Sequence, residues 1–128
     1  MGNRTILFVC KGNSGRSQMA EAFLNHSCKN AKAISAGIEP DGKIHPWTVK
    51  VMKEIGLDVG QQNPKPLSKE MMKKADKIIV MDSDLTKNIP PKYLSKVEIW
   101  QIGKLLGKSI EDVKKIRDII KDKVKELT

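Results

Sequence analysis

The chain has 128 residues, of which 39% are hydrophobic and 30% are charged, and its formal net charge at pH 7 is +9. This length suits a single domain with one core, to which we assign residues 1–128. Two cysteines exclude a disulfide-stapled scaffold, and no apolar run approaches the roughly 20 residues of a membrane span. Since nothing near the start reads as a signal peptide, we expect a cytoplasmic protein with no membrane partner.

The positive charge invites a nucleic-acid interpretation, but the distribution of the lysines argues against it. They are scattered along predicted helices and alternate with acids, as in residues 111–115. This pattern is typical of a solvated helical surface. We therefore predict no nucleic-acid partner, although the excess charge attracts anionic substrates over long range.

The first predicted elements are a strand and a helix joined by a short loop. The apolar run 5–9 predicts the strand, and the run 18–24 predicts the helix, which opens near Arg16. Backbone N–H groups of such a loop can turn inward around an anion, and a helix N-terminus adds further N–H groups and positive charge. We expect the loop to bind an oxyanion through Lys11, Gly12, Asn13, Ser14 and Gly15.

Three side chains of the same segment suggest catalysis. Cys10 ends the strand, and the positive field of the loop favours its thiolate, which makes it a candidate nucleophile. Arg16 has a planar fork that suits two oxygens of a tetrahedral oxyanion, so it joins the oxyanion-binding set. Ser17 could donate a hydrogen bond to the thiolate. The simpler alternative, a buried cysteine in a glycine-containing turn, does not explain the strand, the arginine and the helix together.

The rest of the chain alternates predicted strands and helices. The first half continues with a strand over 31–36 that ends at Gly37, a loop at 40–42, and a helix from Pro46 towards Gly56. The second half has an irregular stretch over 61–66, a short helix capped by Ser68, strands over 77–81 and 97–100, and a helix after Ser109.

This alternation predicts an α/β fold, a four-stranded parallel sheet with helices on both faces. Ligands of such sheets bind beyond the carboxyl ends of the strands. Cys10 lies at such an end, so the predicted fold and the predicted site agree.

The segment from Val9 to Ser17 resembles the phosphate-binding loop of the low-molecular-weight protein tyrosine phosphatases, in which a cysteine, five residues, an arginine and a serine follow one another. The segments 17–22, 35–39 and 51–58 resemble the arsenate reductase branch of that superfamily. The similarity extends over nearly the whole chain. It implies the low-molecular-weight phosphatase fold and a reaction that begins with attack by Cys10 on a tetrahedral centre.

Three functions are the main candidates under this resemblance, and a phosphocysteine carrier like the IIB subunits of sugar transport is a less favoured fourth. We favour an arsenate reductase, in which the Cys10 thiolate attacks arsenate and an external thiol completes the reduction. The first alternative is a protein tyrosine phosphatase that forms a phosphocysteine intermediate. The second is a non-catalytic module that binds arsenate or phosphate. None needs a bound cofactor, but the reductase needs a small thiol or a thioredoxin- or glutaredoxin-like partner.

The usual general acid is missing. Members of the family present an Asp-Pro pair in the loop between the last strand and the last helix, where this chain has Lys104-Leu105. Because positioned acid–base groups contribute about 10²–10⁴ in rate, we expect poor phosphatase turnover. Asp82 and Asp84 follow the third predicted strand and could replace the acid; alternatively, they cap a helix that starts near Leu85.

A second reactive thiol is also missing. Thioredoxin-coupled reductases of the family carry two further cysteines after the third strand, where segment 81–90 has none. The other cysteine, Cys28, lies twelve residues after Arg16. That is about 18 Å along a helix, beyond the roughly 7 Å that a disulfide allows between Cα atoms. We expect Cys28 to be a small core residue and the resolving thiol to come from outside.

Some reductases of the family hold a potassium ion beside the loop. Asn13, Glu21 and Ser35 match its ligands, but Lys65 stands where a carboxylate is expected. We expect no metal, because Asn13 and Glu21 can brace the loop by hydrogen bonds and the Lys65 ammonium could replace the ion electrostatically.

Overall fold

The computed structural model describes residues 4–27, 30–102 and 109–127. In this part of the chain, four strands form one sheet in the order β2-β1-β3-β4, and each pair of neighbours is parallel. The strands are Arg4–Cys10 (β1), Ala31–Gly37 (β2), Lys77–Val80 (β3) and Val97–Ile99 (β4). The α/β prediction of a four-stranded parallel sheet is therefore confirmed.

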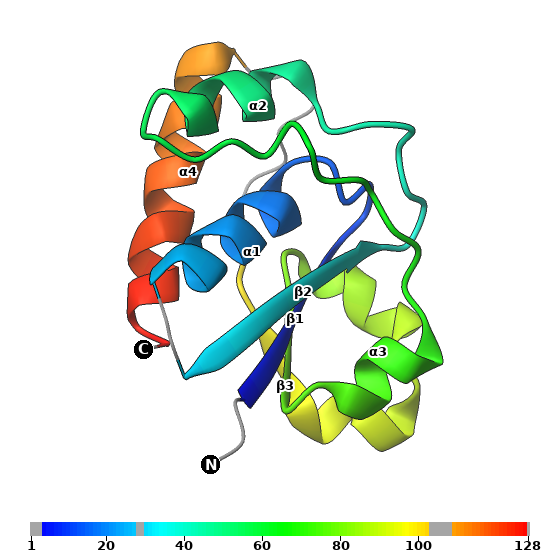
Figure 1. The fold of residues 1–128 in the computed structure, drawn as a ribbon. Helices are drawn as coiled ribbons and strands as arrows, with labels where there is room; N and C mark the ends of the chain where they lie inside the picture. Colours follow the sequence, from blue (N-terminus) through cyan, green and yellow to red (C-terminus); the bar gives the residue numbers. More distant parts are fainter. Residues whose placement is uncertain (1–3, 28–29, 103–108, 128) are drawn as a thin grey trace.

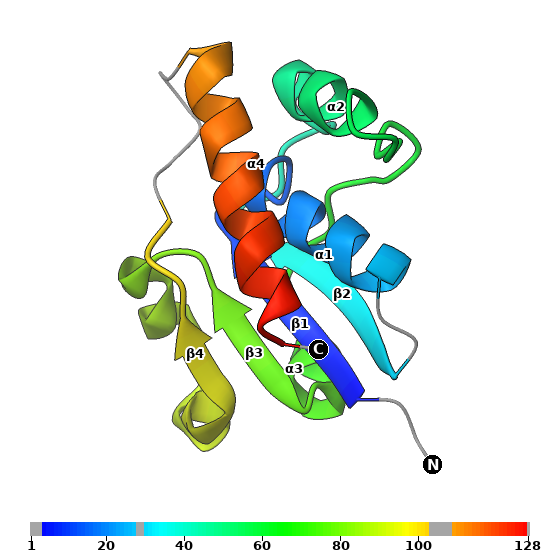
Figure 2. The ribbon, with the colours of Figure 1, turned by 90° about the vertical axis from the view of Figure 1, so that its left-hand side faces the viewer.

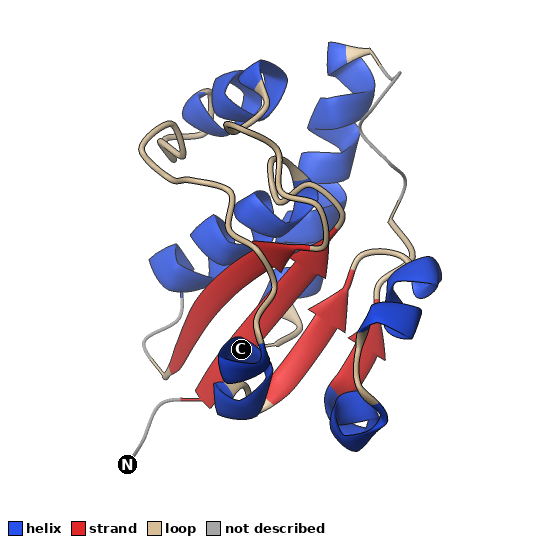
Figure 3. Ribbon diagram, turned by 90° about the vertical axis from the view of Figure 1, so that its right-hand side faces the viewer, coloured by secondary structure: helices blue, strands red, loops and turns tan. Residues whose placement is uncertain are grey.

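Helices cover both faces of the sheet, also as predicted (Figures 1 and 2). One face carries Arg16–Ser27 (α1), Pro46–Lys53 (α2) and Ile110–Lys125 (α4). The other carries Lys69–Lys74 (α3) and two 3₁₀ helices, Ser83–Asn88 (η1) and Pro91–Lys96 (η2) (Figure 3). No helix of the described residues has the length and apolar character that crossing a membrane requires.

The central strand β1 supplies both cores, because its side chains alternate between the two faces of the sheet. Ile6 and Phe8 point to the core shared with α1 and α4, whereas Leu7 and Val9 point to the core under α3 and η1. All four side chains are fully buried. This burial fixes the register of β1. It therefore also fixes the position of its last residue, Cys10, at the carboxyl ends of the strands.

Some boundaries differ from those predicted. Strands β3 and β4 each end one residue earlier than the apolar runs do, at Val80 and Ile99. The helix expected near Leu85 is 3₁₀ rather than α, and η2 was not predicted; the Pro90-Pro91 pair between them prevents a continuous α-helix.

Helix α2 ends before Gly56, the residue towards which the sequence predicted that it extends. Its last α-helical residue is Lys53, but the chain turns on to Gly56, whose φ of +86° is the left-handed conformation that glycine favours. The N–H of Gly56 donates to the carbonyl of Lys53 at 3.0 Å, and that of Leu57 to Met52 at 3.0 Å. The predicted closing role of Gly56 is therefore confirmed.

Candidate active site

The loop between β1 and α1 is held from outside through its carbonyl groups. The neighbouring segment 38–45 donates four backbone N–H groups to it, from Ile38 to Cys10 (3.2 Å), Glu39 to Lys11 (2.8 Å), Asp41 to Gly12 (2.9 Å) and His45 to Ser14 (2.9 Å). The two remaining carbonyls accept from the Gln18 side chain at Asn13 (3.1 Å) and from the Met19 N–H at Gly15 (3.0 Å). Every carbonyl of the loop is thus satisfied by an outer partner.

This arrangement turns the loop amides inward. In a trans peptide the N–H points opposite to the preceding carbonyl, so outward carbonyls direct the following N–H groups towards the enclosed space. Among the described residues, no acceptor takes the N–H of Lys11, Gly12, Ser14 or Gly15. Their binding of an oxyanion stays a prediction, but the geometry is that of an anion nest.

Two small residues let the loop and its support approach so closely. A Cβ atom on Gly12 would lie 2.2 Å from an Asp41 carboxylate oxygen, and one on Gly37 would lie 2.7 Å from the Lys11 carbonyl. The Asp41 carboxylate also accepts a hydrogen bond from the Ser14 hydroxyl at 2.5 Å. A side chain at Gly12 would therefore displace the Asp41 carboxylate from Ser14, and one at Gly37 would collide with the backbone of the loop.

Cys10 sits at the base of the loop and is buried, with 3% of the residue exposed. Its Sγ accepts a hydrogen bond from the backbone N–H of Asn13 at 3.2 Å and lies 2.8 Å from the Ser17 hydroxyl oxygen. That oxygen already accepts from the Asn13 side-chain amide at 2.8 Å, so its hydrogen can point at the sulfur. The structure thus brings together Cys10 and Ser17 in the geometry that the sequence predicted.

Arg16 opens α1 and is buried, with 6% exposure. One nitrogen, Nη1, donates to the Asp82 carboxylate at 2.9 Å and to the carbonyls of Ile102 at 2.9 Å and Met81 at 3.3 Å. These three acceptors fix one corner of the guanidinium. The fork is therefore oriented before any ligand binds, which favours bidentate contact with an oxyanion.

Asp82 and Asp84, the predicted substitute acids, occupy different environments. Asp82 lies next to the site as the ion-pair partner of Arg16 and makes no capping hydrogen bond to η1. Asp84 is exposed within η1. Whether either carboxyl protonates a leaving group stays a prediction. Sequence reasoning missed the orienting role of Asp82. The available signal was an acid two residues after β3, a strand that pairs with β1 up to Val80 and so ends beside the end of β1.

A hydrogen-bond chain connects the loop to β2 and to the middle of α1. The Asn13 side-chain amide donates to Ser17 and also to Ser35 at 3.0 Å, and the Ser35 hydroxyl donates to the Glu21 carboxylate at 2.9 Å. Asn13 holds this place in the left-handed region, with φ of 52°, and its side-chain oxygen Oδ1 accepts from the Lys65 backbone N–H at 2.8 Å. The bracing role predicted for Asn13 and Glu21 is confirmed.

Burial raises the pKa of Glu21, and the charge of Lys65 and the hydrogen bond from Ser35 partly offset that rise. The Lys65 ammonium therefore acts on Glu21 as a neighbouring positive charge. The Lys65 ammonium itself donates to the Asn63 carbonyl at 3.1 Å, and the absence of a potassium ion beside the loop stays a prediction. Two further predictions, the Lys104-Leu105 replacement and the inert role of Cys28, concern positions outside the described residues.

The fold and the loop together define a cysteine-dependent protein that handles tetrahedral oxyanions. Residues 5–128 match the model of the low molecular weight phosphotyrosine protein phosphatase family. The chain belongs to this family, as its resemblance predicted.

Relatives and solved structures agree with this membership. An arsenate reductase from Brevibacillus brevis is 36% identical over 126 residues, which cover 96% of this chain and 92% of the relative. A solved structure of an arsenate reductase in the phosphate binding state is 30% identical with a TM-score of 0.84, covering 97% of this chain and 95% of that one. The low molecular weight protein tyrosine phosphatase from T. tengcongensis is 26% identical with a TM-score of 0.89, covering 98% and 97%.

Proposed function

We propose that this protein is an arsenate reductase that uses Cys10 as its nucleophile and an external thiol as its reductant. The observation that carries the proposal is the loop itself, with inward amides, an oriented Arg16 and the Cys10 sulfur at its base. Similarity to proteins named arsenate reductase, at 36% identity over nearly the whole chain, supports the choice of arsenate among tetrahedral oxyanions.

The first step is attack of the Cys10 thiolate on arsenic. A sulfur–arsenic bond forms, and one arsenate oxygen leaves as hydroxide, which becomes water when it takes a proton. The loop amides and Arg16 hold the remaining oxygens and stabilise their charge in the transition state. A hydroxide or water leaving group depends less on a positioned acid than an alcohol does, so the missing Asp-Pro pair is less harmful here.

The second step needs a thiol from another molecule. The incoming thiolate attacks Cys10 Sγ, so that a disulfide bond forms and the sulfur–arsenic bond breaks. The electron pair of that bond stays on arsenic, which is reduced from As(V) to As(III) and leaves as arsenite. A second thiolate then attacks the mixed disulfide and regenerates the Cys10 thiolate. This chemistry suits a reducing, cytoplasmic compartment and either a small thiol or a redoxin as partner.

A phosphatase is the second candidate, supported by the family model and by the likeness to the T. tengcongensis phosphatase. Cys10 would then form a phosphocysteine, and the leaving alcohol or phenol would need a proton from Asp82, Asp84 or another acid. The third candidate, a non-catalytic oxyanion-binding module, requires the loop alone.

One pair of assays separates the three. Purified protein is incubated with arsenate and with each of several thiol donors, and in parallel with an aryl phosphate, with Cys10→Ser as the control. Arsenite formation that needs both Cys10 and a thiol supports the reductase. Efficient aryl phosphate hydrolysis without arsenite would favour the phosphatase. Oxyanion binding without either product would favour the binding module.

A further inference from the structure

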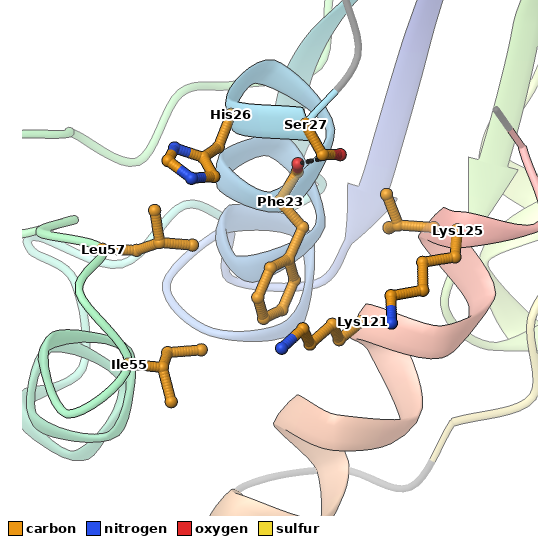
Figure 4. Close-up of a pocket in the computed structure, with 8 residues that line it drawn as sticks. Phe23, His26, Ser27, Ile55, Leu57, Lys121 and Lys125 are labelled. Atoms are coloured by element: carbon orange, nitrogen blue, oxygen red, sulfur yellow. Dashed lines mark hydrogen bonds between the residues drawn. The ribbon is translucent and has the colours of Figure 1, made fainter.

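A cavity of about 160 Å³ opens at the far end of α1 from the loop (Figure 4). It lies where the end of α1, the turn after α2 and the last turns of α4 meet. Its lining is Phe23, His26, Ser27, Ile55, Leu57, Lys121, Val124 and Lys125. Phe23 to Ser27 lie seven to eleven residues beyond Arg16 on α1, a separation of roughly 10–16 Å, so the cavity is separate from the candidate active site.

The inner wall of the cavity is apolar. Phe23 and Val124 belong to the core and are nearly buried, while Ile55 on the opposite side is 38% exposed. The Phe23 ring points into the space between Ile55 and Lys121 (Figure 4). An apolar cavity of about 150 Å³ holds one benzene ring, so this volume suits a single aromatic ring. The Phe23 side chain offers such a ring an aromatic neighbour.

The rim of the cavity is positively charged. Lys121 and Lys125 reach it from α4, and none of the described lining residues is acidic. Asp122 and Glu126 follow Lys121 and Lys125 in the chain but do not line the cavity. Two other carboxylates next to the lining are engaged elsewhere. Glu54 lies within 3.5 Å of the Lys114 ammonium, and the Asp58 carboxylate accepts from the Gly60 N–H at 2.9 Å. A ligand with an apolar body in this cavity would therefore gain from carrying an anionic group.

We propose that this cavity binds a small aryl carboxylate, with its ring against Phe23 and its carboxylate at the Lys121 ammonium. The cavity volume and the apolar wall determine the choice of an aromatic ring, and the Lys121 ammonium determines the choice of a carboxylate. The site does not depend on the reaction at Cys10, so this proposal and the proposed function can be tested separately.

The probe is phenylacetate, titrated into methyl-labelled protein with saturating inorganic phosphate present to occupy the loop. The methyl resonances of Ile55, Leu57 and Val124 should shift and saturate. Two partial ligands test the two halves of the proposal: 2-phenylethanol keeps the ring without the charge, and acetate keeps the charge without the ring. Both should bind more weakly than phenylacetate, and the loss for 2-phenylethanol should reach about fivefold, the upper end for one exposed ion pair.

The matched variants are Lys121→Glu and Lys115→Glu, since both lysines are exposed on α4 and only the first lines the cavity. Lys121→Glu should weaken phenylacetate binding by about fivefold or more, while Lys115→Glu leaves it within about twofold. Equal affinities of the two variants, or equal binding of phenylacetate and 2-phenylethanol, would overturn the proposal. So would shifts confined to residues around Cys10.

Discussion

At the scale of single residues, the hydrogen bonds that Asn13 makes organise the surroundings of the Cys10 sulfur. The Asn13 N–H donates to the sulfur, and its side-chain amide donates to Ser17, which frees the Ser17 hydrogen for the same sulfur. The motif spacing was enough to predict the pairing of Cys10 with Ser17. It was not enough to predict that one asparagine in the left-handed conformation organises both contacts, because that depends on the folded path of the loop.

Arg16 is expected to act through its shape as well as its charge. Three acceptors hold Nη1, which leaves the other edge of the guanidinium for the oxyanion. Arg16→Lys keeps the charge but cannot satisfy those acceptors and an oxyanion together. We expect this variant to lose one charge-assisted hydrogen bond, about 2 kcal/mol, so the Kd for phosphate measured by calorimetry should rise roughly thirtyfold.

The control is Lys11→Ala, which removes an exposed positive charge of the same loop. Its effect should stay within about fivefold, as for other exposed charges. If Arg16→Lys binds phosphate as tightly as the unchanged protein does, the orientation of the guanidinium has no role in binding.

Thr48 on α2 is a residue whose hydroxyl costs stability. It is fully buried, and its Oγ1 has no hydrogen-bond partner in the described part of the chain. Thr48→Val keeps the branched shape and removes the unsatisfied polar atom. We expect the free energy of unfolding, measured by urea denaturation, to rise by about 1 kcal/mol. Thr86→Val is the matched control: it removes a hydroxyl that donates to the Ser83 carbonyl at 2.8 Å, and it should not stabilise the protein.

At the scale of elements, the contact between α1 and β2 contains a titrating group. Burial raises the pKa of Glu21 above its ordinary value of 4.5. Between that value and the raised one, the folded protein binds more protons than the unfolded chain does, so stability falls as the pH rises through this window. The contribution of Glu21 is fully present below the ordinary value and is lost as the pH passes the raised one.

Glu21→Gln should remove this pH dependence, because the amide resembles the protonated acid and can still accept from Ser35. We expect the stability of the variant relative to the unchanged protein to increase as the pH rises through the window, measured by urea denaturation over a pH series. A difference that stays constant with pH would contradict the assignment.

Glu98→Gln provides the control of opposite sign. The hydrogen bond from Trp100, assisted by Lys77, lowers the pKa of Glu98, so its contribution is lost as the pH falls rather than as it rises. The two variants should therefore change the pH profile in opposite directions.

The elements themselves were predictable where local patterns decide them. The apolar run of β1 and the capping residues Ser68 and Ser109 marked their elements, and both serines accept from a backbone N–H as caps do. The 3₁₀ form of η1 and the ion pair of Arg16 with Asp82 were not predictable. They depend on where β3 ends beside β1, which is a property of the assembled sheet.

At the scale of the whole molecule, the sheet places the Cys10 thiol at its carboxyl end, but the described residues place no second thiol beside it. Cys10 lies at the end of β1, and the segment 81–90 that follows β3 at the same edge contains no cysteine. Helix α1 then leads away from the site for twelve residues, roughly 18 Å, before the chain reaches Cys28. We therefore expect a reductase built this way to receive its electrons from another molecule.

Arsenate turnover should therefore depend on an added thiol and survive the substitution Cys28→Ser. Disulfide geometry requires Cα atoms within roughly 7 Å, which is less than half the length of α1. With a small thiol as donor, we expect a mixed disulfide to accumulate on Cys10, visible by intact mass and peptide mapping, in both the unchanged protein and the variant. Loss of arsenite formation in Cys28→Ser, with phosphate binding intact by calorimetry, would mean that α1 unwinds during turnover and that the reductant is internal. If neither protein forms arsenite with any thiol donor while both still bind phosphate, the reaction proposed at Cys10 is wrong and the oxyanion-binding module becomes the better description.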